Sequence, residues 1–196
     1  RTTWRNGAAS FATKKSKQTK TTMTTTARIS PIPLGTRPEL AELEAKIIAK
    51  RGRITPLYQH LLNSPEMAQG WEEFLSAVRQ RNSLPADLRE LIILRVAVLN
   101  RAPYEFEAHI EHALKAGLPQ AKIDAVKSPH IADVFNDIER IVLNMTDAMT
   151  HDIEVPDALF AQVAQHYEGK QLLDLCITVG AYNMVSRVLV ALHIGH

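Results

Sequence analysis

The stretch PADLRELIILRVAVLNRAPYEFEAHIEHALKAG, residues 85–117, decides the fold. Its first half is a run of Leu, Ile and Val that is long enough for a buried helix. The pattern breaks at residues 100–102, Asn-Arg-Ala, and Pro103 suits the first turn of a second helix. Gly117 suits the position just past the end of that second helix. We therefore predict two helices joined by a short turn, with acids and histidines along one face of the second.

Apolar residues recur at helical spacing through the rest of the chain. Ser83 is expected to cap the helix that follows Pro85. The last expected helix is apolar on nearly all sides, which predicts deep burial against a partner helix. No alternating strand-length segment is flanked by turn signals, so we predict an all-α fold. The further helices are expected at residues 39–50, 55–64, 65–82, 118–128, 131–152, 156–167 and 171–195.

The length of 196 residues favours one compact domain, which we expect to cover residues 31–196. Residues 1–38 hold eight of the 23 basic residues and no acid, so the remainder holds 15 basic against 21 acidic residues. Such a mildly acidic body is not suited to nucleic-acid phosphates, and we expect no nucleic-acid partner. No uninterrupted apolar run reaches the roughly 18 to 20 residues of a membrane span, so we expect no membrane partner. The single cysteine, Cys176, excludes an internal disulfide and favours a reducing compartment such as the cytoplasm.

The first 30 residues form a basic leader that is rich in Thr and Lys and nearly free of branched aliphatic residues. This composition cannot bury enough apolar surface to offset the entropy of ordering, so we expect disorder. The basic, hydroxyl-rich and acid-free character also fits a transit peptide, which would make the protein mitochondrial. Met23 stands just before TTTA, so a third reading is that residues 1–22 are an extension foreign to the native protein.

Glu105, His109 and His112 recur at a spacing that places them on one face of a helix. Three interpretations are open. In the first, the face is a solvated, charge-paired surface. In the second, it is a zinc or iron site, since one carboxylate and two imidazoles are suitable ligands. In the third, it holds an acid/base pair, because an imidazole titrates near neutral pH. Two-histidine metal sites on a helix use a spacing of four residues, and these histidines are three apart, so we expect no metal.

Glu90 is the only acid in the apolar helix LRELIILRVAVL, residues 88–99. Arg89 and Arg95 are available charge partners, so one reading is a structural ion pair. In the other reading Glu90 faces a cleft beside His109. Burial is then expected to raise the pKa of Glu90 toward a value that is useful in proton transfer.

Three segments of this sequence resemble the carboxymuconolactone decarboxylases and the related alkylhydroperoxidase D-like proteins. They are RELIILRVAVLNRAPYEFEAH (89–109), HALKAGLPQAKIDAV (112–126) and VGAYNMVSRVLVAL (179–192). The resemblance covers roughly residues 40–195 and implies a single-domain antiparallel helical bundle of the alkylhydroperoxidase D-like type. It also implies a homo-oligomer, either a trimer or a hexamer.

The peroxidase branch of this family has an acid, a CxxC pair twelve residues later, and a histidine four residues beyond the second cysteine. Here Glu90 stands at the acid position and His109 at the histidine. Ala102 and Glu105 stand where the two cysteines would be, and Tyr104 where that branch often has another histidine. A dithiol cycle needs a thiolate and a resolving thiol. Because both cysteines of the motif are replaced here, that mechanism is excluded. Peroxidase activity is the weaker alternative.

The Tyr-Glu-Phe form at residues 104–106 resembles the decarboxylase branch, whose reaction releases carbon dioxide from a carboxymuconolactone and uses no cofactor. The resemblance implies a small carboxylated lactone or keto acid as substrate. We expect acid/base roles for Glu90, Glu105 and His109, and weaker roles in holding the substrate for Tyr104, Arg95 and His112. The alternative is a non-catalytic or stress-associated oligomeric member of the family.

Overall fold

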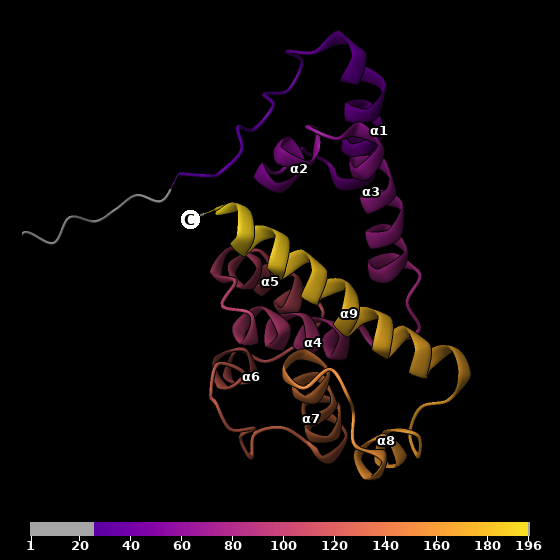
Figure 1. The fold of residues 1–196 in the computed structure, drawn as a ribbon. Coiled ribbons are helices and arrows are strands. Elements are labelled where there is room, and N and C mark those ends of the chain that lie inside the picture. Colours follow the sequence, from indigo (N-terminus) through magenta and orange to yellow (C-terminus); the bar gives the residue numbers. More distant parts are fainter. Residues whose placement is uncertain (1–25, 196) are drawn as a thin grey trace, which may run out of the picture.

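The computed structural model describes residues 26–195, and that part of the chain contains α-helices and no β-strand (Figure 1). The predicted all-α, single-domain fold is confirmed. The predictions for residues 1–25 lie outside the described residues. A 3₁₀ helix, η1 (Pro38–Leu40), precedes α1 (Ala41–Arg51), α2 (Pro56–Leu61), α3 (Pro65–Gln80), α4 (Ala86–Leu99), α5 (Pro103–Lys115), α6 (Gln120–Ala125), α7 (Asp137–His151), α8 (Asp157–Val163) and α9 (Gly169–Leu192).

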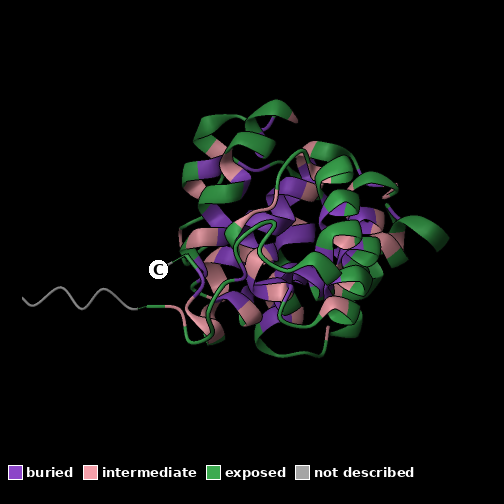
Figure 2. Cartoon of the chain, turned by 90° about the horizontal axis from the view of Figure 1, so that it is seen from above, coloured by how far each residue is buried: buried purple, intermediate pink, exposed green. Residues whose placement is uncertain are grey.

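The central helix is α4, which packs against α5, α7 and α9 (Figure 1). Residues 91–94, Leu-Ile-Ile-Leu, are completely shielded from solvent, so every side of α4 is covered. Burial of each such side chain contributes about 1.5–3 kcal/mol, which favours this enclosed position. Figure 2 shows the buried residues in the middle of the molecule and the exposed residues around them. A polar side chain on α4 is therefore held away from bulk water.

The turn between α4 and α5 forms where the sequence predicts it. Asn100 caps the end of α4, and Arg101 adopts the left-handed conformation with φ of 55°. Pro103 then begins α5, where its missing N–H is not needed. Because so few residues separate the helices, they pack against each other as a hairpin. The predicted helix pair is confirmed.

The end of α5 also follows the sequence signal. Gly117 has a φ of 92°, which favours glycine. The N–H of Gly117 donates to the carbonyl of Leu114 (3.0 Å), and the N–H of Leu118 donates to that of Ala113 (2.9 Å). These two bonds form a Schellman motif, which satisfies the last carbonyls of the helix.

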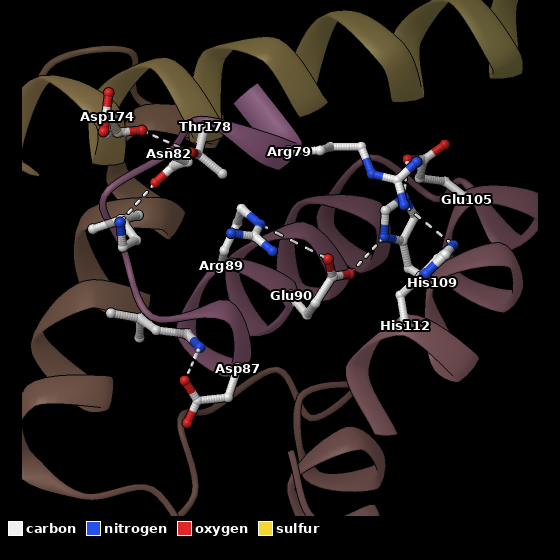
Figure 3. A network of polar contacts seen from close by, with 12 residues as sticks. Arg79, Asn82, Asp87, Arg89, Glu90, Glu105, His109, His112, Asp174 and Thr178 are labelled. Atoms are coloured by element: carbon white, nitrogen blue, oxygen red, sulfur yellow. Dashed lines mark hydrogen bonds and ion pairs between the residues drawn. The ribbon is translucent and has the colours of Figure 1, made fainter. Parts of the chain in front are cut away.

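The loop between α3 and α4 is fastened to α9 (Figure 3). The N–H and hydroxyl groups of Ser83 each donate to Oδ2 of Asp174 (2.7 Å). The amide of Asn82 donates to the hydroxyl of Thr178 (2.8 Å). Pro85 stands at the N-cap of α4, with no side-chain capping bond. The expectation that Ser83 caps α4 is wrong, because the helix begins two residues later and Pro85 occupies the N-cap position.

Helix α7 starts later than its apolar pattern predicts. The expected helix covers residues 131–152, but α7 begins at Asp137. Asn136 accepts a hydrogen bond from the N–H of Glu139, and the Glu139 carboxylate accepts one from the N–H of Asn136 (both 2.9 Å). This reciprocal capping box fixes the start of the helix.

The helices η1 to α3 form a smaller unit with its own core. That core contains buried Ile32, Leu40, Ile47, Tyr58 and Leu62. Helix α3 packs against α9, so the unit lies beside the central bundle at the end where α5 and α9 meet (Figure 1). The candidate site lies where these two parts meet.

Helix α9 is long and apolar enough to cross a membrane by length and composition alone, with a mean hydropathy of 1.6 in its most apolar window. Polar residues such as Asn183, Ser186 and Arg187 interrupt its apolar residues, so the helix passes by average hydropathy and not as an unbroken apolar run. Half of that window is buried inside the molecule, as in the core helix of a globular protein. Leu173, Ile177 and Met184 remain exposed.

Residues 26–30, the last part of the expected leader, lie against the end of α9. The N–H of Arg28 donates to the carbonyl of Leu192 (2.9 Å), and its guanidinium donates to that of Ala191 (3.0 Å). Arg28 is thus tied to the C-terminal end of the domain.

Candidate active site

His109 lies between two buried glutamates (Figure 3). Its Nδ1 atom is 2.7 Å from Oε2 of Glu90, and its Nε2 atom is 3.3 Å from Oε1 of Glu105. Glu90 is 3% exposed, Glu105 4% and His109 6%. The interpretation of this face as a solvated surface is therefore wrong for Glu105 and His109, because α4 and α9 cover them, whereas His112 is exposed.

Each side chain is positioned by a regular element. Glu105 and His109 are one turn apart on α5, so their side chains adjoin. The α4–α5 hairpin places Glu90 opposite His109. From α9, the ring of Tyr182 packs edge-on against the imidazole, with centroids 5.2 Å apart. Nothing in the apolar pattern around Tyr182 indicated this contact.

The carboxyl group of Glu90 stays ionised despite its burial. Burial acts to raise the pKa of Glu90, but the hydrogen bond and charge of His109, together with Arg79 and Arg89, hold it below its usual range. The expectation of a raised pKa is therefore wrong. Desolvation is the largest single effect, and the cationic neighbours together outweigh it.

The imidazole of His109 favours its protonated form. Burial acts to lower the pKa of His109, but the hydrogen bonds and charges of Glu105 and Glu90 raise it above its usual value of 6.5. A protonated imidazole donates from both nitrogens, and here each nitrogen faces a carboxylate oxygen. The two carboxylates thereby hold both nitrogens of His109 in place.

A pocket of about 120 Å³ opens beside His109, between the N-terminal unit and the α5–α9 face. Its wall combines aromatic rings with cationic side chains. This combination suits a small anionic molecule with an unsaturated or ring-shaped part. The lining includes Tyr58, Trp71, Tyr104 and Tyr182, then Arg51, Arg53 and Arg79, and also Glu105, His109 and His112.

Two of the expected substrate-holding residues, Tyr104 and His112, do line this pocket. Burial raises the pKa of the Tyr104 phenol, which keeps it neutral and able to donate a hydrogen bond. The His112 ring is tilted against that of His109, with centroids 5.5 Å apart, and its Nε2 atom lies 3.2 Å from the Arg79 guanidinium. Burial, then the charges of Arg79 and His109, lower the pKa of His112, so it is neutral and can accept from Arg79.

Arg95 does not belong to the site. Its guanidinium forms a two-pronged ion pair with Asp147 of α7 and donates to the carbonyls of Val126 (2.9 Å) and Ser128 (2.7 Å). Only 2% of Arg95 is exposed, and Arg95 is not among the residues that line the pocket beside His109. The expectation that Arg95 holds the substrate is wrong: Arg95 joins α4 to α7 and to the segment after α6.

Sequence reasoning missed Arg79. This residue projects from α3 into the pocket wall, contacts His112, and helps to lower the pKa of Glu90 (Figure 3). It lies near the polar end of an ordinary amphipathic helix, so no local pattern marked it. Only the packing of α3 against α9 brings it to the site.

The pocket brings together carboxylate, imidazole, phenol and guanidinium groups. Among residues 26–195, no group of three or more His, Cys, Asp or Glu side chains is arranged to hold a metal ion. The thiol of Cys176 is not among the groups that line the pocket, and burial raises its pKa. A thiol that resists ionisation is a poor nucleophile.

Part of the chain is similar in sequence to known proteins. Residues 65–147, which include Glu90, Glu105 and His109, match the carboxymuconolactone decarboxylase family. The chain is 26% identical over 115 residues to the uncharacterized protein YdfG of Bacillus subtilis (strain 168). That alignment covers 58% of this chain and 78% of YdfG.

Solved structures share the fold. One is an uncharacterized peroxidase-related protein with an alkylhydroperoxidase AhpD core, from Ralstonia eutropha JMP134. It has a TM-score of 0.73 and 16% identity, covering 86% of this chain and 90% of that one. Another is a variant of the debrominase Bmp8 in complex with 2,3,4-tribromopyrrole. It has a TM-score of 0.70 and 17% identity, covering 88% of this chain and 91% of that one. Residues 65–147 are thus similar to the carboxymuconolactone decarboxylase family, and the fold is similar to that of solved alkylhydroperoxidase D-like proteins.

Proposed function

We propose that this protein is a cofactor-independent carboxy-lyase that acts on a small carboxylated lactone or keto acid. The observation that carries the proposal is the position of His109, held between buried Glu90 and Glu105 at the wall of a pocket with a cationic lining. The similarity of residues 65–147 to the carboxymuconolactone decarboxylase family supports an enzyme-like role at this site. The acid/base chemistry is inferred from the residues.

In the proposed reaction the bond between the carboxylate carbon and the adjacent carbon breaks, and carbon dioxide leaves. The electron pair moves into the conjugated carbonyl and forms an enolate, so the substrate itself is the electron acceptor. His109 then donates its proton to carbon and recovers one from solvent. Net consumption is one proton per carbon dioxide released.

The remaining residues have supporting roles in this scheme. Glu90 and Glu105 keep the imidazole charged and oriented, because Glu90 accepts a hydrogen bond from Nδ1 and Glu105 forms an ion pair with the Nε2 side of the ring. Tyr104 and Arg79 stabilise negative charge on the enolate oxygen or the substrate carboxylate, since both groups are donors in the pocket wall. Aromatic walls limit the access of water.

The test is a screen of carboxylated lactones and keto acids for carbon dioxide release, with wild-type protein and His109→Gln. Removal of a general acid lowers the rate by about 10²–10⁴-fold. Gln is preferred to Ala because it keeps a donor between the two glutamates. A matched control is His151→Gln, which changes an exposed histidine at the end of α7. Release that is equal in wild type and His109→Gln would refute the catalytic role, and no release from any substrate would favour the non-catalytic alternative.

We also propose that the protein is a homo-oligomer that associates through α9. The exposed residues Leu173, Ile177, Gly180 and Met184 follow one another at spacings of four, three and four, which places them in one row. A row of this kind packs well against a second copy of itself. Light scattering should give a mass above 21.9 kDa for wild type and a smaller mass for Ile177→Glu. A monomeric wild type would refute this association.

A further inference from the structure

A second, wider cleft of about 500 Å³ adjoins the pocket beside His109. The two spaces are lobes of one depression, because they share the wall residues Arg51, Arg53, Thr55, Arg79 and His112. We call the smaller space the inner lobe and the larger one the outer lobe. Ligand pockets usually measure about 300–1,000 Å³, so the inner lobe alone is small and the outer lobe is of ordinary size.

The outer lobe is strongly cationic. Six Lys and Arg side chains line it, and its one acidic residue, Glu90, is already bonded to His109. Residues 39–196 carry more acid than base, so composition alone does not explain this concentration of positive charge. The six are Lys50, Arg51, Arg53, Arg79, Arg89 and Lys115.

Most of these cations lack a full complement of acceptors within the described residues. Arg51 is paired with Glu72, and Lys115 with Glu111. No carboxylate is paired with Lys50, Arg53 or Arg79 in the part of the chain that the structure describes. Cations that converge without counter-ions repel one another, so they are favourable where an anion binds between them.

Arg89 supplies an independent sign of a ligand. Its Nε atom is buried and has no hydrogen-bond partner, and the nearest carboxylate oxygen, Oε1 of Glu90, is 3.9 Å away. A buried guanidinium nitrogen that is left unbonded costs free energy. Figure 3 shows Arg89 and Arg79 reaching toward the Glu90–His109 pair from different elements.

We propose that the outer lobe binds a polyanionic tail of the substrate, either a phosphate ester or a group with two or more carboxylates. The reacting end of the same molecule lies in the inner lobe, which has room for roughly one small ring. Guanidinium forks match phosphate and carboxylate oxygens in pairs, so both sources share this chemistry. The inference deepens the proposed function and rests on it for the identity of the reacting end.

The test is calorimetric binding of inorganic pyrophosphate and of citrate to the full chain at low salt. Both Lys50 and Arg53 lie in the outer lobe and outside the Glu90–His109–Glu105 group, so Lys50→Gln with Arg53→Gln is the test variant. The matched control removes the same charge with Lys46→Gln and Lys127→Gln, whose side chains are 59% and 54% exposed elsewhere. We expect about tenfold weaker binding in the test variant and no change in the control.

Tighter binding of pyrophosphate than of citrate identifies the tail as a phosphate ester, and the reverse order identifies a polycarboxylate. No binding of either probe, or equal weakening in the test and control variants, would overturn the inference. The His109→Gln variant separates this inference from the proposed function. Probe binding without turnover of any carboxylated substrate refutes the lyase alone, and turnover without probe binding refutes the outer lobe alone.

Discussion

The Nδ1 atom of His109 on α5 lies 2.7 Å from Oε2 of Glu90 on α4, and both side chains are buried. This contact joins residues that are 19 positions apart. It decides the state of both groups, because the pKa of Glu90 is lowered and the pKa of His109 is raised. An ion pair inside a helix hairpin is therefore the centre of the site.

The pair makes stability depend on pH. The contribution of His109 is fully present below its unfolded pKa of 6.5 and is lost as the pH rises through its higher folded pKa. The contribution of Glu90 is fully present above its unfolded pKa of 4.5 and is lost as the pH falls through its lower folded value. Both contributions to stability are fully present between pH 4.5 and pH 6.5, the pKa values of the two groups in the unfolded chain.

We therefore expect the free energy of unfolding of wild type to exceed that of His109→Gln most at about pH 6, and the gap to narrow toward about pH 9. The narrowing amounts to about 1.4 kcal/mol for each pH unit by which folding raises the pKa. Urea denaturation across this range measures it, with His151→Gln as the control histidine variant. A gap that stays constant across the range would show that folding does not change the pKa of His109.

Arg95→Met should destabilise the protein and leave substrate binding unchanged. Removal of the guanidinium leaves Asp147 without its partner and two carbonyls without donors, and such a loss costs about 3–5 kcal/mol. Urea denaturation measures the cost, and Lys46→Met at an exposed site is the control. Unaltered stability combined with a raised KM would instead place Arg95 in substrate binding.

Gly195→Ala should disturb Tyr104. A Cβ atom at Gly195 would lie 2.0 Å from Cδ2 of Tyr104, so the ring must move away. Gly52→Ala is the matched control, because Gly52 has nearly the same φ (76° against 77°) and open space around it. Both variants lose about 1 kcal/mol to the left-handed backbone, and only Gly195→Ala shifts the Tyr104 ring resonances and raises KM. Identical behaviour of the two variants would show that the contact with Tyr104 has no effect on the pocket.

Cys176→Ser should leave hydroperoxide consumption unchanged. The chain has one cysteine, and burial raises the pKa of its thiol, so neither a reactive thiolate nor a resolving thiol is available. The measurement is the rate of hydroperoxide loss in the presence of a dithiol reductant, with wild type and variant side by side. A thiol-dependent peroxidase would lose its activity in the variant.

Local signals were sufficient for the parts of the site that lie within one hairpin. Pro103 and Gly117 set the limits of α5, and helical spacing placed Glu105 beside His109. Of the two readings left open for Glu90, the position beside His109 agrees with the structure. The start of α7 could also have been predicted from the sequence, since Asn136 and Glu139 have the spacing of a capping box.

The remaining features depend on contacts between distant segments. Arg95 is five residues from Glu90, about 140° around α4. It therefore faces α7 and Asp147, not the pocket. Arg79 reaches the site only because α3 packs on α9. The predicted direction of the pKa change of Glu90 was wrong for the same reason: the apolar helix predicted desolvation, and the largest opposing effects come from His109 on α5 and Arg79 on α3.

The most direct test of the account is an NMR titration of the His109 imidazole nitrogens in wild type and in Glu90→Gln, without substrate. Our account predicts a pKa above 6.5 in wild type, and a lower pKa in Glu90→Gln because one of the two carboxylate charges is removed. A wild-type pKa at or below 6.5, or one that is unchanged by Glu90→Gln, would contradict the claim that His109 is held as a protonated donor.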